Sequence, residues 1–147
     1  MRAVLQRVDR GSVSIDGTIH GQIGKGLVIL VGFGHGDNAE TVRKMCRKIL
    51  QLRIFEDENG KMNRSVTDIN GELLIISQFT LFADCRRGNR PDFIQAMPPQ
   101  AAESIYDQFV RSMQGCGLYV QTGKFAAYMQ LSLVNNGPVT IIIDLSE

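Results

Sequence analysis

The sequence predicts a single α+β domain, spanning residues 1–147, with mainly antiparallel strands and two flanking amphipathic helices. Two observations carry this prediction. Segments with strand periodicity alternate with two segments of helical periodicity, and neighbouring strand segments are joined by short turns. A length of 147 residues suits one domain, and a hydrophobic fraction of 44% is enough for a core. Charged residues make up 21% of the chain, which excludes wholesale disorder.

The first third of the chain has the pattern of β-strands. Val13 and Ile15 alternate with serines, which is the period of a half-buried strand. Asp16-Gly17 is a hairpin signal, and residues 27–31 form an uninterrupted apolar run with the length of a buried strand. We therefore expect a hairpin followed by a buried strand.

The segment 38–52 changes to helical periodicity, and its outer face is basic. Its apolar residues recur at the spacing i, i+3, i+4 and i+7; they are Val42, Met45, Cys46 and Ile49. Asp37 is followed three residues later by Glu40, which resembles a capping box. We therefore expect Asp37 to be the N-cap of this helix.

A second helix is expected to begin at Pro98-Pro99, because proline is tolerated in the first turn of a helix. Gly115 and Gly117 mark its end. Its apolar stripe consists of Ala102, Ile105, Phe109 and Met113.

The remaining segments are expected to be strands separated by turns. Asn70-Gly71 marks a turn before the apolar strand 72–77. Near the other end, apolar and polar residues alternate over 129–133, and a further apolar strand covers 139–145. The sequence Asn-Asn-Gly-Pro at 135–138 favours a hairpin turn between these last two strands.

The composition argues against several classes of protein. No run approaches the roughly 18 apolar residues of a membrane span, and Gln6 and Arg7 interrupt the first apolar run, which argues against a signal peptide. The three cysteines are far apart without a C-x-x-C motif, so we expect no disulfide framework and a cytoplasmic location. The two histidines lack metal-ligand spacing, so we expect no metal and no cofactor.

Two polar segments are candidate sites. Ser77-Gln78-Phe79-Thr80-Leu81 ends an apolar strand, and alternation would place Gln78 and Thr80 on the face opposite Ser77. Neither histidine is nearby in sequence to activate a hydroxyl, so both a capped strand end and a site stay open. A loop with Arg86, Arg87 and Arg90 could hold phosphates, or could be ordinary solvated charge.

Taken together, the segments of this chain resemble the D-aminoacyl-tRNA deacylase family, of the D-tyrosyl-tRNA deacylase type, over essentially the whole length. The segments that carry the resemblance are 1–8, 52–55, 60–63, 77–81, 88–91, 122–125 and 133–140. The most specific signatures are SQFTL at 77–81 and N-x-G-P-V-T at 135–140. The chain departs from the family pattern at Asn136, where aspartate is usual, and at Asp92, where serine is common.

The resemblance implies a barrel-like sheet and a cytoplasmic enzyme that acts in chiral proofreading. Its substrate would be D-aminoacyl-tRNA, whose ester to the 3′-terminal adenosine it would hydrolyse, and mischarged glycyl-tRNA would also be accepted. The resemblance further implies a homodimer with its active sites at the interface, and neither a metal, a cofactor nor a membrane as a partner.

The resemblance also implies roles for individual residues. Gly137 and Pro138 would form a cis peptide that reaches into the partner's pocket and excludes L side chains by a clash. Arg7 would orient this Gly-Pro loop. Phe125 and Met129 are the candidates for contacts to the terminal adenosine.

The catalytic residues implied by the resemblance are Ser77, Gln78, Phe79 and Thr80, whose backbone would line the ester and its developing oxyanion. Thr80 could be an acyl-accepting nucleophile, but the sequence offers no base for it. We favour hydrolysis assisted by the ribose 2′-hydroxyl, with Thr80 as a positioning residue, because aminoacyl esters are already activated. Two alternatives remain open: a non-catalytic RNA-binding module, and a small-ester hydrolase without tRNA dependence.

Overall fold

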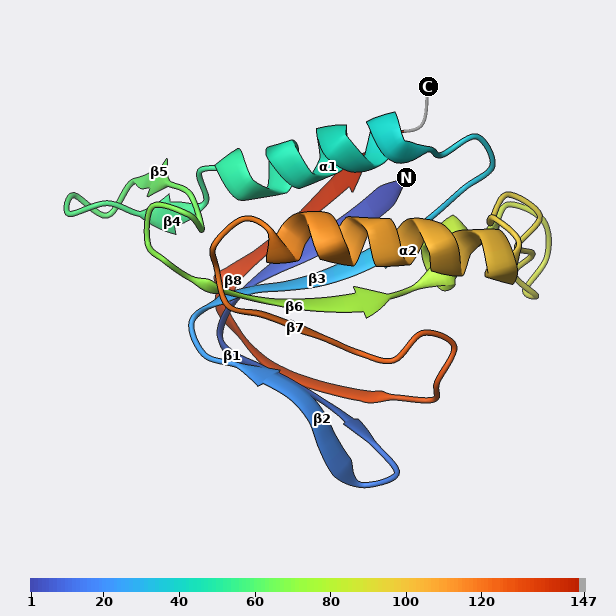
Figure 1. Ribbon diagram of the computed structural model, residues 1–147, viewed down its shortest axis with the longest axis horizontal. Coiled ribbons are helices and arrows are strands. Elements are labelled where there is room, and N and C mark those ends of the chain that lie inside the picture. Colours follow the sequence, from blue (N-terminus) through green and yellow to red (C-terminus); the bar gives the residue numbers. More distant parts are fainter. Residues whose placement is uncertain (146–147) are drawn as a thin grey trace.

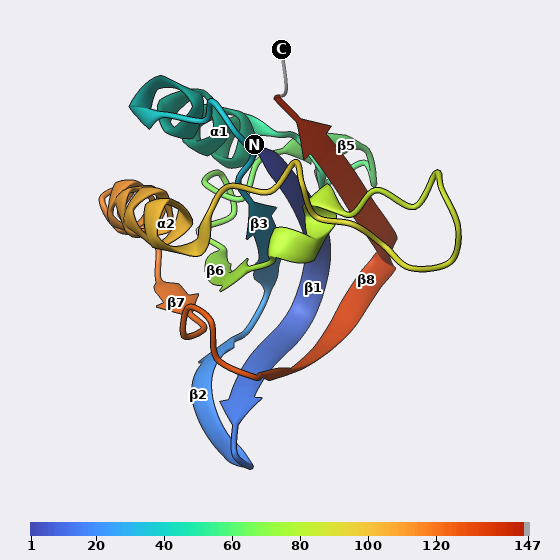
Figure 2. The same ribbon diagram turned by 90° about the vertical axis from the view of Figure 1, so that its right-hand side faces the viewer.

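The structure is a computed structural model that describes residues 1–145. It contains one six-stranded sheet with the order β2-β1-β3-β6-β7, and β8 also pairs with β1. Both helices cover the same face of the sheet, and the strands curve until the sheet is nearly closed into a barrel (Figure 1 and Figure 2). The predicted α+β class, with a barrel-like sheet and two helices, is confirmed.

Strand β1 (Arg2–Ile15) organises the sheet, because it is long enough to pair with three other strands. Its hairpin with β2 (Thr18–Ile23) turns at Asp16 and Gly17, whose φ angles of 50° and 77° suit a two-residue turn. Its first half pairs antiparallel with β3 (Gly26–Gly32), which is almost entirely buried. The predicted hairpin and buried strand are therefore confirmed.

Two pairings at the other side of the sheet are parallel. Strand β6 (Glu72–Ser77) runs parallel to β3, and β7 (Val120–Thr122) runs parallel to β6. Helix α1 (Ala39–Gln51) connects β3 with β6, and α2 (Pro99–Gln114) connects β6 with β7. Such long connections are what parallel neighbours require. Because β3 and β6 run in the same direction, the residues that follow them meet at one edge of the sheet.

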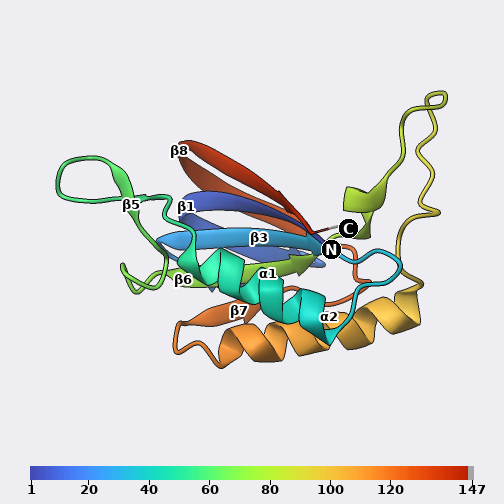
Figure 3. The ribbon, with the colours of Figure 1, turned by 90° about the horizontal axis from the view of Figure 1, so that it is seen from above.

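The helices bury the apolar stripes that their periodicity predicts. In α1 the buried residues are Val42, Met45, Cys46 and Ile49, and in α2 they are Ala102, Tyr106, Phe109 and Met113. Ile105, expected on the stripe of α2, is half-buried beside it. The two helices lie side by side over the core (Figure 3). Among residues 1–145, no helix has the length and apolar character needed to cross a membrane.

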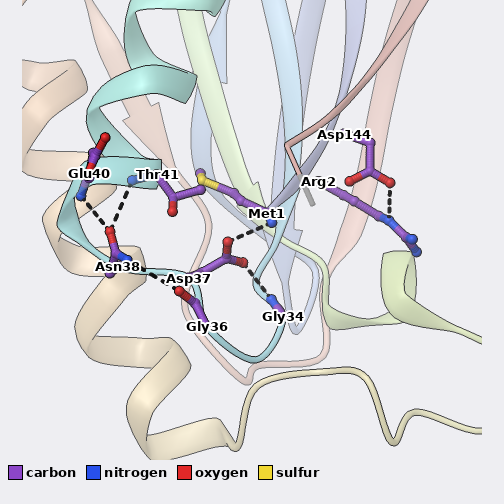
Figure 4. Close-up of polar contacts among 9 residues, drawn as sticks. All are labelled: Met1, Arg2, Gly34, Gly36, Asp37, Asn38, Glu40, Thr41 and Asp144. Atoms are coloured by element: carbon purple, nitrogen blue, oxygen red, sulfur yellow. Dashed lines mark hydrogen bonds and ion pairs between the residues drawn. The ribbon is translucent and has the colours of Figure 1, made fainter. Parts of the chain in front are cut away.

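The N-cap of α1 is Asn38, so the prediction of Asp37 was wrong by one residue. Asn38 Oδ1 accepts the backbone N–H groups of Glu40 at 2.8 Å and Thr41 at 3.3 Å. Asp37 Oδ1 instead accepts a hydrogen bond from the amino group of Met1, as Figure 4 shows. The residue that bonds to Asp37 lies 36 positions away in the chain. A local sequence pattern therefore could not show that Asp37 is unavailable as the cap.

Strand β8 (Gln130–Asp144) is continuous, so the hairpin turn expected at 135–138 was wrong. Both halves of β8 pair with β1, and the extra residues form a bulge: Gln6 pairs with Thr140, whereas Val8 pairs with Asn135. The Asn135 side chain closes the bulge by accepting the Val139 N–H at 2.7 Å. A bulge fits here because β1 continues past it and offers a ladder to both halves. A separate small hairpin consists of β4 (Phe55–Glu56) and β5 (Met62–Arg64).

Candidate active site

The SQFTL segment forms a turn at the end of β6. Ser77 is the last residue of the strand, and Gln78 leads into a short 3₁₀ helix, η1 (Phe79–Phe82). The Gln78 N–H donates to the Val31 carbonyl at 2.7 Å, which extends the β3–β6 ladder by one bond. Because β3 ends at Gly32, no ladder partner remains beyond this point. The expected strand alternation over 77–81 was therefore wrong.

Gly32 allows the turn to pack closely on the end of β3. A Cβ atom at Gly32 would lie 2.6 Å from the carbonyl oxygen of Gln78 and 3.3 Å from the Leu81 side chain. Such a contact with a backbone oxygen would displace the turn. The position of the SQFTL turn thus depends on a glycine in the neighbouring strand.

A pocket of about 600 Å³ lies beside this turn, at the carboxyl ends of β3 and β6. In open sheets with parallel strands, this is the edge at which ligands bind. Ser77, Gln78 and Phe79 line one side, and Phe125 and Met129, from the segment between β7 and β8, line another. Its further walls include the apolar residues Phe33, Phe93, Met97, Ala102 and Tyr128. The structure thus brings five of the predicted site residues together.

Phe125 and Met129 are fixed by contacts behind the pocket. The Phe125 ring centroid lies 5.7 Å from that of Tyr106 in α2. The Tyr106 hydroxyl donates to the Ile75 carbonyl at 3.2 Å, and burial raises the pKa of Tyr106, which keeps it a neutral donor. Met129 Sδ accepts the Lys124 N–H at 3.4 Å. This wall is therefore preformed in the single chain.

Thr80 has a polar partner but no base. The Gln78 side-chain amide donates a hydrogen bond to the Thr80 hydroxyl oxygen. Within residues 1–145 no imidazole, amine or carboxylate is bonded to this hydroxyl, and His35 Nε2 instead contacts the Ile94 carbonyl at 2.8 Å. A threonine nucleophile needs an activating group. The described residues supply no such group, so the Thr80 hydroxyl is better suited to positioning a substrate than to attacking it.

The N-x-G-P-V-T segment forms the bulge of β8, and Arg7 holds it. Arg7 is buried, and its guanidinium donates to the Asn136 carbonyl at 3.0 Å and to the Ile54 carbonyl at 2.8 Å. The Gly137-Pro138 peptide is cis, and Gly137 has a φ of 133°. Both residues are exposed. The bulge thus projects a rigidly anchored Gly-Pro pair away from the core.

Asn136, where the resemblance leads us to expect aspartate, contacts Arg7 through its side chain. Its side-chain oxygen accepts from Arg7 at 3.2 Å, and its amide donates to Asp9 Oδ1 at 2.7 Å. An aspartate at this position could not donate to Asp9 and would set two carboxylates side by side. Asn136 therefore bonds to Arg7 and Asp9 at once, which an aspartate here could not do.

The structure does not bring all the predicted residues into one place. Arg7, Gly137 and Pro138 do not line the pocket of Ser77 and Phe125 in this chain. Thr80 is exposed next to the pocket and is tied to it through Gln78. The apolar wall of the pocket, which includes Phe33 and Met97, was missed by sequence reasoning because such residues carry no chemical signal.

The loop between η1 and α2 extends away from the sheet (Figure 3) and carries the three arginines. Arg86 is paired with Asp84 at 2.6 Å, and these hydrogen bonds lower the pKa of Asp84 to about 2. Arg87 and Arg90 are exposed and make no ion pair within the described chain. Residues 1–145 contain no group of three or more His, Cys, Asp or Glu side chains arranged to hold a metal ion.

The fold and the pocket define a class of protein: a small α+β protein with a largely apolar pocket beside a strand-end turn that carries hydroxyl and amide side chains. A family model described as D-Tyr-tRNA(Tyr) deacylase matches residues 4–144. The chain belongs to this family, as the resemblance predicted.

Curated relatives match over nearly their whole length. The chain is 52% identical over 144 residues to a D-aminoacyl-tRNA deacylase of Thermosipho africanus, covering 98% of this chain and 97% of the relative. It is 52% identical over 147 residues to one of Clostridioides difficile, covering 100% and 99%. The family match and these relatives confirm the predicted activity, which is hydrolysis of the ester bond of D-aminoacyl-tRNA.

Solved structures share the fold. The structure described as c-Myc DNA Unwinding Element Binding Protein superposes with a TM-score of 0.94 at 43% identity, covering 100% of both chains. A probable eukaryotic D-amino acid tRNA deacylase superposes with a TM-score of 0.85, covering 98% of both chains, and its 19% identity supports the fold alone. The roles of individual residues stay predictions.

Proposed function

We propose that the pocket beside η1 receives the aminoacylated 3′ end of tRNA, with the terminal adenosine against Phe125 and Met129. An apolar wall that ends in an aromatic ring suits a nucleobase, because every base offers a face for stacking. Ser77, Gln78 and Phe79 line the same pocket from the strand-end turn. This arrangement directs the ester toward the strand-end turn.

The turn supplies backbone donors for the oxyanion. Phe79 and Thr80 begin η1, so their N–H groups have no acceptor inside that short helix. The Gln78 N–H is already bonded to Val31, which leaves the two later groups as the donors in this proposal. Fixed backbone donors stabilise developing charge without reorganisation, and removing one such donor commonly costs about 100-fold or more in rate.

Water is the nucleophile in this mechanism, and the ribose 2′-hydroxyl of the substrate assists its attack. The part of the chain that the structure describes places no activating base on Thr80, so in this proposal its hydroxyl positions the reacting groups together with Gln78. An aminoacyl ester is activated already, and orientation beside an oxyanion site contributes most of the remaining acceleration. No metal or cofactor enters this sequence of steps.

The single observation that supports chiral selection is the position of Gly137-Pro138: anchored by Arg7, exposed, and outside the pocket of its own chain. A loop held this way can complete a site only on another molecule. Within residues 1–145, strand β8 pairs only with β1, and it exposes Val134 and Ile142, which are 36% and 73% accessible. These features support a homodimer in which each Gly-Pro pair enters the partner's pocket.

The Gly-Pro pair acts as a wall that excludes L side chains. The Gly-Pro backbone contacts the amino group of the substrate. It would clash with a side chain that leaves the substrate Cα in the L configuration, so only a side chain in the D configuration has space. A wall made of backbone discriminates by position, so D residues of many sizes pass, and glycine passes as well. Such an enzyme works where aminoacyl-tRNA is made, so we place it in the cytoplasm.

Matched D- and L-aminoacyl-tRNA, glycyl-tRNA and free D-aminoacyl esters test the proposal in one assay of ester hydrolysis. We expect rapid release from D-aminoacyl-tRNA, release from glycyl-tRNA, and none from the L substrate. Binding without release would instead support a non-catalytic RNA-binding module. Equal turnover of the free esters would support a small-ester hydrolase and contradict a site built for tRNA.

A further inference from the structure

The loop between η1 and α2 carries two cations that the site described above does not use. Residues 84–92, the arginine loop, are closed at their base by two backbone hydrogen bonds between Asp84 and Asp92, at 2.9 and 3.1 Å. Arg86 is held within the loop by its ion pair with Asp84. Arg87 and Arg90 are exposed, and neither makes an ion pair within residues 1–145. Their guanidinium groups are therefore available to an external anion.

The arginine loop is joined directly to the pocket beside η1. Phe93, the first residue after the loop, lines this pocket. Its ring packs edge-on against Phe79 of the SQFTL turn, with the ring centroids 5.1 Å apart. Arg90 precedes Phe93 by three positions, so the two Cα atoms are at most about 11 Å apart. An extended ligand that leaves the pocket past Phe93 therefore meets the arginines.

The same pocket exposes aromatic rings. Tyr128, Phe79 and Phe93 all line it, although they are 89%, 58% and 37% exposed. Large side chains that are exposed together indicate a binding surface. The adenosine site proposed at Phe125 and Met129 accounts for one base and leaves Tyr128 without a role. Aromatic rings beside cations are the combination that binds single-stranded nucleic acid, because bases stack on the rings and phosphates contact the cations.

The basic face of α1 lacks this setting. Arg43 and Arg47 are exposed there as well, but no residue of α1 lines the pocket beside η1. The helix also contains no aromatic residue. It offers charge without a stacking surface, and an arginine on α1 therefore serves as a matched control.

We propose that the arginine loop and Tyr128 bind the single-stranded nucleotides that precede the terminal adenosine of tRNA. Arg87 and Arg90 contact the phosphates of these nucleotides, and the Tyr128 ring stacks on a base. The inference rests on the proposed binding of the terminal adenosine in the pocket. Because this surface touches no reacting atom, it stabilises the bound substrate and the transition state equally. Phosphate contacts carry no sequence information, so the arginines do not select among tRNA sequences.

The salt dependence of KM for D-aminoacyl-tRNA tests the phosphate contacts. In the double variant Arg87→Gln/Arg90→Gln, the slope of log KM against log salt concentration should decrease by about 0.7 for each lost contact. At about 0.1 M salt, KM should rise roughly 10-fold while kcat stays native. The double variant Arg87→Lys/Arg90→Lys keeps both charges and should keep the native slope. The control Arg47→Gln should match the native chain in KM, kcat and slope.

Tyr128→Leu separates stacking from charge. Loss of the ring should raise KM by about 5-fold or more and leave the salt slope native. Tyr119→Leu, which changes an exposed tyrosine outside this pocket, should leave KM native. Because the substituted side chains are all exposed, the Tm of each variant should stay within about 2 °C of the native value.

Several results would contradict the proposal. A native KM and a native slope in the double glutamine variant would overturn the phosphate contacts, as would a fall in kcat as large as the expected rise in KM. A native KM in Tyr128→Leu would overturn the stacking contact. A larger fall in Tm would mark the residues as structural and would also overturn the proposal.

Binding of uncharged tRNA, measured by fluorescence anisotropy at several salt concentrations, requires no hydrolysis. We expect the same decrease in slope in the double glutamine variant. A failure of the proposed function would appear separately, as a native chain that binds tRNA with the expected salt dependence and releases no amino acid. A native chain that hydrolyses D-aminoacyl-tRNA, but whose affinity for tRNA does not depend on Arg87 and Arg90, would contradict the role of the arginine loop alone.

Discussion

The SQFTL turn and the Gly-Pro bulge differ in what surrounds them. The turn residues 77–79 line a pocket together with Phe125 and Met129 of the same chain. Gly137-Pro138 is anchored by buried Arg7 through the Asn136 carbonyl, but it faces solvent. In our account the groups that bind the adenosine and line the ester come from one chain, whereas the Gly-Pro pair that selects the D configuration comes from its partner. Variants of the two regions should have different effects on rate and on selectivity.

The largest effect is expected for Arg7→Ala. It removes the donors to the Asn136 and Ile54 carbonyls, and charged hydrogen bonds of this kind contribute roughly 1.5–3 kcal/mol each. We expect the free energy of unfolding to fall by about 3–5 kcal/mol and rejection of L-aminoacyl-tRNA to be lost. Urea denaturation and the ratio of D to L turnover measure these changes. Arg10→Ala, an exposed arginine on the same strand, should change neither.

Gly137→Ala should damage selectivity more than stability. The new Cβ would lie 2.8 Å from Val139 Cγ2 and 3.1 Å from the Arg7 guanidinium, and a φ of 133° disfavours alanine. The strain costs about 1–3 kcal/mol, and the displaced loop should reduce the D to L ratio of kcat/KM by about 10-fold or more. Gly17→Ala, at a φ of 77° with open space around it, is the matched control. Equal D to L selectivity in the two variants would contradict the claim that the Gly-Pro pair excludes L substrates.

Phe125→Leu should weaken substrate binding without changing specificity. Loss of a stacking ring costs about 1–3 kcal/mol, so KM for D-aminoacyl-tRNA should rise by roughly 5- to 100-fold while the D to L ratio stays constant. Tyr119→Leu provides a control, because Tyr119 is exposed and lies outside this pocket. An unchanged KM would remove Phe125 from the nucleoside site.

The smallest effect is expected for Thr80→Ala. If Thr80 positions groups and does not attack, kcat should fall by no more than about 10-fold. Single-turnover kinetics and mass spectrometry of the quenched reaction measure this. A covalent aminoacyl adduct on Thr80 would show that the hydroxyl is the nucleophile, and a loss of kcat of more than about 1,000-fold would contradict a positioning role.

Local sequence patterns predicted where the helices and strands lie better than they predicted which strands pair. Helical periodicity located both helices, and Asp16-Gly17 located the hairpin. The parallel pairing of β3 with β6 was not predicted, because it depends on how a helix crosses the sheet. Likewise, Asp37 lost its capping role to a contact with Met1 that the local pattern does not contain.

The candidate site was predictable only through its polar signatures. SQFTL was a candidate from its residues because polar side chains end an apolar strand there, whereas N-x-G-P-V-T was expected to be a hairpin turn and became a candidate only through the family resemblance. Residues such as Phe33 and Met97 form the pocket wall equally, but in sequence they are indistinguishable from core residues. The anchoring of Gly137-Pro138 by Arg7, about 130 positions apart, depends on the pairing of β1 with β8.

Mixed dimers test the central claim most directly: the Gly-Pro pair of one subunit completes the pocket of the other. One protomer would carry Ala127→Trp, which fills the pocket, and the other Gly137→Val, which disrupts the loop. Each variant alone should be inactive toward D-aminoacyl-tRNA or unselective. Purified mixed dimers contain one intact pocket facing one intact loop, so they should regain about half of the native selective activity. Activity no higher than that of the parental variants would contradict the account.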